Sequence, residues 1–379
     1  MNAPCARLSV AAAVVAIVIS LASAALASDE FSSAEQSALT AIVEKGMTEQ
    51  RQPGVIVGIR IPGRGSWTTA FGKADIEANR PMDHADHVRI ASITKTFVAT
   101  AILQLVDQGK LRLDDKLEAY VEGIPNGEKI TLRQLLGMTS GIYDFTGDQQ
   151  FLKDFAANPL MPFGPQDVVA IVRRHVPEFA PGAKVAYCDT NYVLLGVVLE
   201  KAAGKPVAQV IEEQILTPLK LRGTSFPVTA MMPAPFARGY YAGEDGKEKL
   251  KDYTSTNPNV AWTAGAMIST LDDLRVWAKV FAAGTLLKPG THIEQLQFST
   301  VGDSGGLSIG YGLGIAKFGD FIGHNGAILG YTTAMLYLPD ADATLVVEGN
   351  QSSNFSNAAT EILLALAKQL FPERFAGKK

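Results

Sequence analysis

The stretch RIASITKTFVAT, residues 89–100, begins like a buried strand and continues like a helix. Ser92 and Lys95 lie where the two patterns meet. If Ser92 begins the helix, Lys95 lies one turn further on the same face, and its amine turns back toward the hydroxyl. Two interpretations fit: Ser92 is a nucleophile with Lys95 as its base, or Ser92 caps the helix beside a solvated lysine.

The nucleophile interpretation makes physical demands on the surroundings of this pair. A serine hydroxyl is a weak nucleophile without a base, and Lys95 can serve as one only if its pKa falls by about three pH units toward neutrality. Burial in a cleft can lower the pKa of a lysine by that much, and the free N–H groups of a helix N-terminus suit an oxyanion. A Ser-x-x-Lys spacing is common by chance, so the choice between a nucleophile and a helix cap depends on motifs elsewhere in the chain.

Composition indicates a globular protein with a large core. The chain has 379 residues, of which 47% are hydrophobic and 19% charged. The formal net charge of −4 provides no general basic surface, so nucleic acid is not expected as a partner.

The N-terminus predicts export. Arg7 precedes an apolar run from Leu8 to Leu26, and Ala25-Leu26-Ala27 has the small residues of a signal-peptidase site. We therefore expect residues 1–27 to be a signal peptide and the mature protein to be periplasmic or secreted. The alternative is an uncleaved anchor, the one case in which a membrane would be a partner. Cleavage would leave Cys188 as the single cysteine, with no intramolecular disulfide.

Hydrophobic periodicity divides the rest of the chain into a sheet part and a helical part. Strands are expected at 54–61 and 66–72 and again near the C-terminus, and helices at 32–50, 96–108, 131–141, 191–204, 269–284 and 355–370. This order predicts one catalytic domain, 28–379, with its sheet part at about 32–100 and 262–371 and a helical insertion at about 101–261. The active site is expected in the cleft between the two parts.

Two further motifs carry polar groups next to predicted elements. Tyr187-Cys188-Asp189 precedes a helix: Tyr187 is either a proton-transfer group near a lysine or a core residue, and Asp189 is a candidate helix cap. His324-Asn325-Gly326 either positions polar groups beside a glycine that admits a substrate backbone, or forms a turn between strands.

Three other patterns are not expected to carry chemistry. GDSGG (302–306) resembles a nucleophile motif without its strand and helix, so we expect a flexible loop. DHADH (83–87) has no further His or Cys cluster near it, and GYGLG (310–314) has no following helix. We therefore predict no metal and no phosphate-binding loop.

Taken in order, Ser92-x-x-Lys95, Tyr187-x-Asp189 and His324-x-Gly326 resemble the three motifs of the penicillin-recognising serine hydrolases. The resemblance is to class C β-lactamases and serine D-alanyl-D-alanine carboxypeptidases, and it covers about residues 35–371. The phrases ILQLVDQGKLRLDDKL (102–117) and GHNGAILGYTT (323–333) are similar to that family as well. It implies an α/β (α+β) fold of the β-lactamase/DD-peptidase type, an antiparallel sheet flanked by helices plus an all-helical subdomain.

The resemblance also implies a two-step acyl transfer without a cofactor. Ser92 would attack a carbonyl while Lys95 or Tyr187 takes its proton, and Tyr187 would protonate the leaving amine. The backbone N–H groups of Ser92 and Ala327 would form the oxyanion hole. The implied substrate-binding residues are Asp189, His324, Asn325, Gly326, Trp262 and Tyr143.

Three departures from the family pattern bear on the substrate. Asp189 stands where an asparagine is usual, and an ionised carboxylate can only accept hydrogen bonds. Ala316 stands where carboxypeptidases commonly carry an arginine for the substrate carboxylate. Asn325 and Ala327 replace hydroxyl residues that often flank the glycine of the third motif. Recognition of a terminal carboxylate is therefore expected to be weakened.

These observations predict an extracytoplasmic serine hydrolase that forms an acyl-enzyme. The first expectation is D-alanyl-D-alanine carboxypeptidase-like or β-lactamase-related amide hydrolysis, acting on a small molecule or a peptidoglycan-type peptide. An esterase or D-amino-acid amidase of the same fold is the alternative. Another is a binding or sensor protein that β-lactams acylate with little turnover.

Overall fold

The computed structural model describes residues 30–243, 248–353 and 357–376, so the predicted signal peptide lies outside the described residues. Its centre is one antiparallel sheet of nine strands in the order β3-β2-β1-β13-β12-β11-β10-β9-β8. In that order the strands are Arg80–Pro81, Gly65–Asp75, Gly54–Ile61, Ala343–Gly349, Tyr331–Leu338, Phe321–Ile328, Ala316–Phe318, Leu307–Tyr311 and Ser299–Ser304. The antiparallel sheet with flanking helices predicted from the sequence is confirmed.

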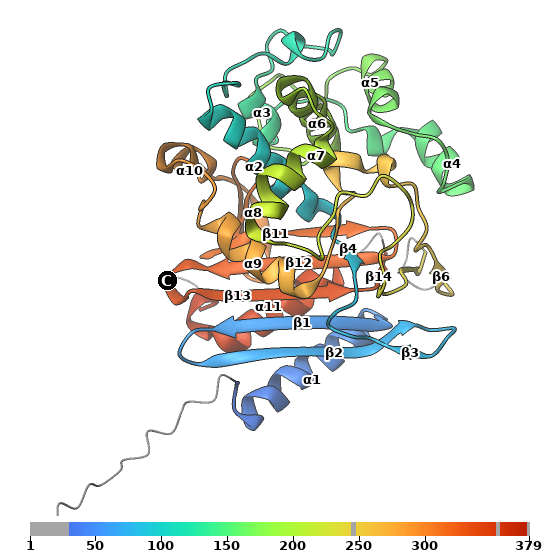
Figure 1. Cartoon of the computed structure of the whole chain (residues 1–379), viewed down its shortest axis with the longest axis vertical. Coiled ribbons are helices and arrows are strands. Elements are labelled where there is room, and N and C mark those ends of the chain that lie inside the picture. The colour runs from blue at the N-terminus through green and yellow to red at the C-terminus, as the bar shows by residue number, and fades with distance from the viewer. Residues whose placement is uncertain (1–29, 244–247, 354–356, 377–379) are drawn as a thin grey trace, which may run out of the picture.

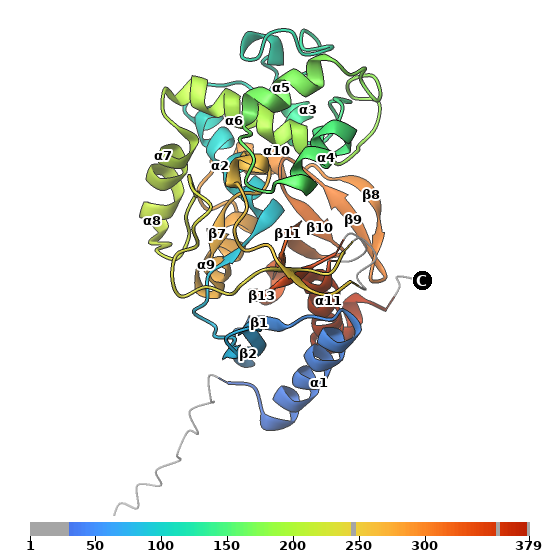
Figure 2. The same ribbon diagram turned by 90° about the vertical axis from the view of Figure 1, so that its right-hand side faces the viewer.

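The central strands are buried on both faces because helices cover the sheet from both sides. Helices α1 (Ser33–Glu49) and α11 (Ala358–Leu370) pack together on one face, and α9 (Leu271–Ala282) covers the other. Figure 2 shows α9 and α11 on opposite sides of the strands. This explains why β12 and β13 read as continuous apolar runs rather than as alternating patterns.

The helical part lies at one end of the sheet, above it in Figure 1. Its central helices are α2 (Thr94–Asp107), which is buried along most of its length, and α6 (Asp189–Ala203), which packs against it. The remaining helices are α3 (Leu132–Leu136), α4 (Gln149–Ala157), α5 (Pro165–Arg173), α7 (Val207–Ile211), α8 (Thr217–Leu219) and α10 (Pro289–Gln295). Within the described ranges, none of the helices is long and apolar enough to span a bilayer.

Two parts of the chain differ from the expected secondary structure. The GDSGG segment is not a flexible loop: Gly302–Ser304 end strand β8, and Gly305 and Gly306 form its turn into β9. Both turn glycines have positive φ, +57° and +83°, which other residues adopt only with strain. Short strands also form within and after the helical region: β5 (Tyr240–Tyr241) pairs with β6 (Lys251–Asp252) and with β14 (Gln351–Ser352).

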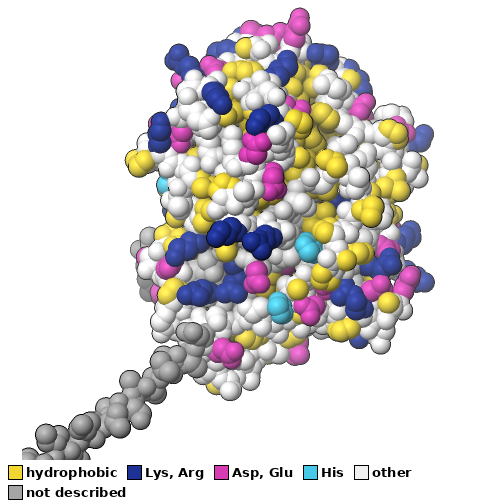
Figure 3. Space-filling model, viewed as in Figure 1, with side chains coloured by type: hydrophobic (Ala, Val, Ile, Leu, Met, Phe, Trp, Pro, Cys, Tyr) yellow, Lys and Arg dark blue, Asp and Glu magenta, His cyan; other side chains and the backbone are white. Residues whose placement is uncertain are grey.

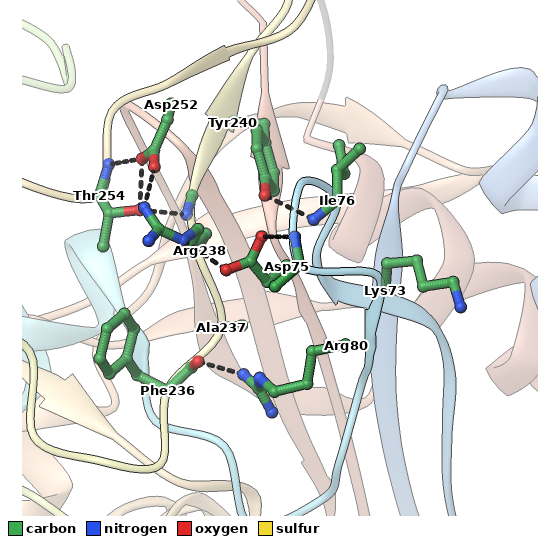
Figure 4. Close-up of polar contacts among 12 residues, drawn as sticks. Lys73, Asp75, Ile76, Arg80, Phe236, Ala237, Arg238, Tyr240, Asp252 and Thr254 are labelled. Atoms are coloured by element: carbon green, nitrogen blue, oxygen red, sulfur yellow. Dashed lines mark hydrogen bonds and ion pairs between the residues drawn. The ribbon is translucent and has the colours of Figure 1, made fainter.

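An ionic cluster fastens the long segment that follows α8 to the edge of the sheet (Figure 4). The guanidinium of Arg238 donates to Asp75 at the end of β2, at 2.6 Å, and to Asp252, at 2.5 Å. Arg80 donates to the carbonyl of Phe236 and pairs with buried Asp86. The cluster therefore fixes the segment that leads to Thr256 and Asn257, two residues of the cavity described below.

Glu348 is an unpaired carboxyl group in the middle of the sheet. It lies on β13 opposite Thr333, is fully buried, and neither of its oxygens has a hydrogen-bond partner among the described residues. Burial, reinforced by the charges of Asp272 and Asp86, raises the pKa of Glu348 well above its usual range. The native protein therefore holds this group protonated.

Replacing Glu348 with glutamine should flatten the pH dependence of stability. The unfolded chain releases this proton above about pH 4.3, whereas the native state keeps it, so the contribution of Glu348 to stability falls by about 1.4 kcal/mol per pH unit until the native group ionises. Urea unfolding of both proteins between pH 5 and 7 measures the two slopes. The exposed Glu77→Gln change is the control, and equal slopes for wild type and Glu348→Gln would contradict the assignment.

Candidate active site

Ser92 lies on a sharp turn between a strand and a helix. The chain leaves β4 (Val88–Arg89), passes through a 3₁₀ turn at Ala91–Ile93 and enters α2. Ala91 has φ of +48°, a strained conformation for a residue with a side chain, and it comes directly before Ser92. The turn is held by Thr333, whose hydroxyl donates to the carbonyl of Ile90 at 3.0 Å. The backbone geometry presents Ser92 at the beginning of the helix.

Lys95 is the buried partner of Ser92 rather than a solvated lysine. Its side chain has no exposed surface, and its Nζ donates to Ser92 Oγ at 3.0 Å, Asp189 Oδ1 at 2.6 Å and the carbonyl of Ala264 at 2.6 Å. An ammonium has three N–H donors, and here each one finds an acceptor. The arrangement is that of a protonated lysine, so the free site holds Ser92 beside an ammonium.

Tyr187 contacts the same pair of residues. Its hydroxyl is hydrogen bonded to Ser92, and Lys95 Nζ lies 5.0 Å from the centre of its ring. Tyr187 is 48% exposed as a whole residue, whereas its hydroxyl group is buried. Burial of the hydroxyl, followed by the charge of Asp189, raises the pKa of Tyr187 above its usual value, and the bond to Ser92 opposes that rise. Tyr187 is therefore a neutral phenol in the free site.

Two carboxyl groups lie close together at this cluster, Asp189 at the start of α6 and Asp144 in the segment that precedes α4. Asp189 is the first residue of the helix rather than its cap, a position held by Cys188, which is buried. The N–H of Asp189 donates to Asp144 Oδ2 at 3.1 Å. Burial and the neighbouring charge of Asp189 raise the pKa of Asp144 to about 6. The sequence motifs did not point to Asp144, although it lies in the segment GIYDF at 141–145.

His324 lies within strand β11, not in a turn, and it is buried behind the site. Its Nδ1 contacts the carbonyl of Asn325 at 2.6 Å, and its Nε2 contacts the hydroxyl of Tyr311 at 3.2 Å. Because a carbonyl only accepts, Nδ1 carries the proton and Nε2 accepts from Tyr311. Burial lowers the pKa of His324 to about 4, so the ring is neutral.

Asn325 points away from the site, as the alternation of side chains along a strand requires. Its amide donates to Thr360 of α11 at 3.0 Å. The side chain of Asn325, which the sequence placed at the substrate, therefore lies against α11 in the described structure.

Gly326 allows β11 to lie directly against the Ser92 turn. A Cβ atom at this position would be 2.6 Å from the carbonyl oxygen of Ile90 and 2.7 Å from the nitrogen of Ser92. Real contacts of that kind are essentially never this short, so the close approach depends on glycine. As a result Ala327, the next residue, lines the same cavity as Ser92. That proximity is what the predicted oxyanion hole requires.

The cavity in front of Ser92 has a volume of about 220 Å³ and is mostly apolar. Ser92, Asp189 and Ala327 lie in its wall together with Thr256 and Asn257. The apolar wall is formed by Phe145, Phe151, Leu152, Phe155, Val260, Ile328 and Leu329, with Thr146, Ala261, Ala264 and Gly265 completing the lining. Phe145 and Phe151 meet edge to face, with ring centres 5.2 Å apart.

Two residues expected to line this cavity lie elsewhere. Trp262 is buried against α6, where a Cβ on Gly196 would come within 2.6 Å of its ring. Tyr143 stacks on His175, with ring centres 3.8 Å apart. The cavity positions that the sequence assigned to Trp262 and Tyr143 are occupied by the phenylalanines of the apolar wall. The spacing of Phe151 and Phe155, four residues apart on α4, was the available signal.

Outside the cavity, the surface carries side chains of both charges. On the face drawn in Figure 3, Lys and Arg side chains gather in a band across the lower middle with a few Asp and Glu side chains beside them, and elsewhere both signs are scattered. Within the described part of the chain, no group of three or more His, Cys, Asp or Glu side chains is placed to hold a metal ion.

The fold and this site define a serine hydrolase with a Ser-x-x-Lys nucleophile and a nearby tyrosine. The family model described as Beta-lactamase matches residues 39–369. The chain belongs to the Beta-lactamase family, which confirms the resemblance found in the three motifs.

Similar solved structures share the fold over almost the whole chain. The D-stereospecific amidohydrolase from Streptomyces sp. is 33% identical, with a TM-score of 0.75, over 86% of this chain and 97% of that one. The D-amino acid amidase from Ochrobactrum anthropi SV3, solved with L-phenylalanine, has a TM-score of 0.80 and 23% identity, over 89% of this chain and 99% of that one.

Curated relatives are similar in sequence. The D-aminopeptidase of Brucella anthropi is 25% identical over 337 residues, which are 88% of this chain but 62% of the relative. The chain therefore spans about three fifths of the length of that protein. Penicillin-binding protein 4* of Bacillus subtilis is 27% identical over 332 residues, 82% of this chain and 72% of the relative.

Replacing Gly326 with alanine should reduce activity strongly without unfolding the protein. The new Cβ would push β11 away from the Ser92 turn and misplace Ala327. Loss of one oxyanion donor typically lowers the rate about 10²- to 10³-fold, and we expect a loss of that size in kcat. Gly290→Ala in α10 is the matched control, since a Cβ there meets nothing within 4 Å. Wild-type kcat in Gly326→Ala would contradict the role of this close approach.

Proposed function

We propose that the protein hydrolyses amide bonds of D-amino acid derivatives outside the cytoplasm, through an acyl-enzyme on Ser92. The observation that carries this proposal is the cavity itself. It joins the nucleophile to an apolar wall, and among the described residues that line it the one ionisable side chain is a carboxylate, that of Asp189. The names of the similar amidohydrolase, amidase and aminopeptidase support the same reaction. The N-terminal signal pattern supports the location.

The charges in and near this cavity do not fit a carboxypeptidase, which must bind the terminal carboxylate of its substrate. Asp189 would repel such a group, and Ala316 supplies no positive charge. The next residue, Lys317, directs its ammonium to the ring of Phe298, 5.9 Å from its centre. An amide with a neutral leaving group avoids these conflicts.

The proposed reaction has two halves. Ser92 Oγ attacks the amide carbonyl once Lys95 has given up one proton to solvent, and the proton of Ser92 passes to Lys95 directly or through Tyr187, while the N–H groups of Ser92 and Ala327 stabilise the oxyanion. The C–N bond then breaks, and the leaving amine takes a proton from Tyr187. A water molecule attacks the ester on Ser92, gives one proton to the catalytic groups and releases the acid. Ser92 regains its own proton, so the cycle consumes one amide and one water.

A substrate panel tests this function. We expect hydrolysis of D-phenylalanine amide, much slower hydrolysis of L-phenylalanine amide, and little release of D-alanine from diacetyl-L-Lys-D-Ala-D-Ala. Ser92→Ala should lower amide hydrolysis by about 10³-fold or more, because no other group can form the acyl-enzyme. Cleavage of the tripeptide alone would favour a carboxypeptidase, and full activity of Ser92→Ala would refute the mechanism.

The apolar wall predicts which side chain the substrate carries. Val260 borders the cavity, and a phenylalanine there would occupy part of its volume of about 220 Å³. Val260→Phe should lower kcat/KM for D-phenylalanine amide at least tenfold and leave D-alanine amide nearly unchanged. Val276→Phe on the exposed surface of α9 is the control. Equal losses on both amides would show that the apolar wall does not select the side chain.

A further inference from the structure

Asp189 has an unusual place in the cavity. Among the described residues that line it, Asp189 is the one with an ionisable side chain, and the others are apolar or neutral. Its side chain is 28% exposed, so a ligand can reach it. A carboxylate in an otherwise neutral, apolar wall attracts a cation and repels an oxygen that carries negative charge.

The bond from Lys95 leaves part of this carboxylate available. Lys95 donates to Oδ1, and no hydrogen bond from the described part of the chain reaches Oδ2. The nearby carboxyl of Asp144 accepts from the N–H groups of Thr146 and Asp189 and has no ion-pair partner among the described residues. With both carboxylates ionised, the two neighbouring negative charges share one ion-paired lysine, Lys95, which contacts Asp189. The cluster therefore has room for one further positive charge.

The distances between Ser92, Lys95 and Asp189 place this additional positive charge next to the carbonyl that Ser92 attacks. Ser92 Oγ and Asp189 Oδ1 bond to the same nitrogen at 3.0 and 2.6 Å, so they lie no more than 5.6 Å apart. In an α-amino acid the nitrogen is separated from the carbonyl carbon by one atom, at about 2.5 Å from the bond lengths of the backbone. A substrate attacked by Ser92 can therefore bring its α-ammonium to Asp189.

We propose that Asp189 binds the free α-ammonium of the substrate and selects amine-bearing amides over their N-acylated counterparts. This rests on the amide hydrolysis proposed above. An ammonium donates a charge-assisted hydrogen bond to the carboxylate. N-acylation removes the positive charge and leaves one neutral N–H donor on that nitrogen, and the added carbonyl oxygen finds no donor on a carboxylate. The asparagine usual at this position could donate to such a carbonyl.

The test compares D-phenylalanine amide with N-acetyl-D-phenylalanine amide in wild type and in Asp189→Asn. The asparagine keeps an acceptor for Lys95 and adds a donor. We expect kcat/KM for the free amine to fall at least tenfold more than that for the acetylated amide, because only the free amine loses its charged partner. Asp272→Asn, at the first turn of α9, should change neither value. An equal loss on both substrates would mean a purely structural role and would overturn the proposal.

Wild type alone provides a second measurement in case Asp189→Asn does not fold. It should prefer D-phenylalanine amide to 3-phenylpropanamide, which lacks only the amine, by at least tenfold in kcat/KM. Similar rates on the two would overturn the ammonium site while leaving amide hydrolysis intact. If neither these amides nor the acetylated one is hydrolysed, the proposed function itself fails.

Discussion

The buried ammonium of Lys95 is the constraint on which the rest of the site depends. A charge removed from water is tolerated only when acceptors replace the water, and three do so here: the nucleophile, the start of α6 and the carbonyl of Ala264. One nitrogen thereby ties together α2, α6 and the segment that precedes α9. The hydroxyl of Ser92 owes its position to this shared donor as much as to its own turn.

The sheet completes the site by coming close to that turn. Gly326 removes the side chain that would keep β11 away, and the bond from Thr333 to the carbonyl of Ile90 fastens the two elements. The opposite wall of the cavity is positioned by an ionic cluster that lies outside the cavity. Arg238, clamped between Asp75 and Asp252, anchors the segment that carries Thr256 and Val260. Rigid surroundings on both sides keep the nucleophile and the substrate wall in a fixed relation.

The fold and the Ser92–Lys95 pair could be predicted from the sequence, and the parts of the site that could not be predicted have physical reasons. The spacing of Ser92 and Lys95 places both on one helical face, so their contact could be predicted locally. The partnership with Asp189, 94 residues away, follows only from the packing of α6 against α2. Trp262, Tyr143 and Asn325 were assigned to the substrate because their segments resemble the family. A segment can reach a site while its side chain points elsewhere, as Asn325 does on β11. The phenylalanine wall was missed because its members come together only in three dimensions.

The most direct test of the account is to observe the covalent intermediate. Wild-type protein mixed with an ester of D-phenylalanine and quenched with acid during turnover should gain the mass of one phenylalanyl group. Peptide mapping should place that group on the peptide containing Ser92, and Ser92→Ala should show no adduct. Rapid turnover without any adduct at the shortest quench times, or an adduct on another residue, would contradict a site built around Ser92 and Lys95.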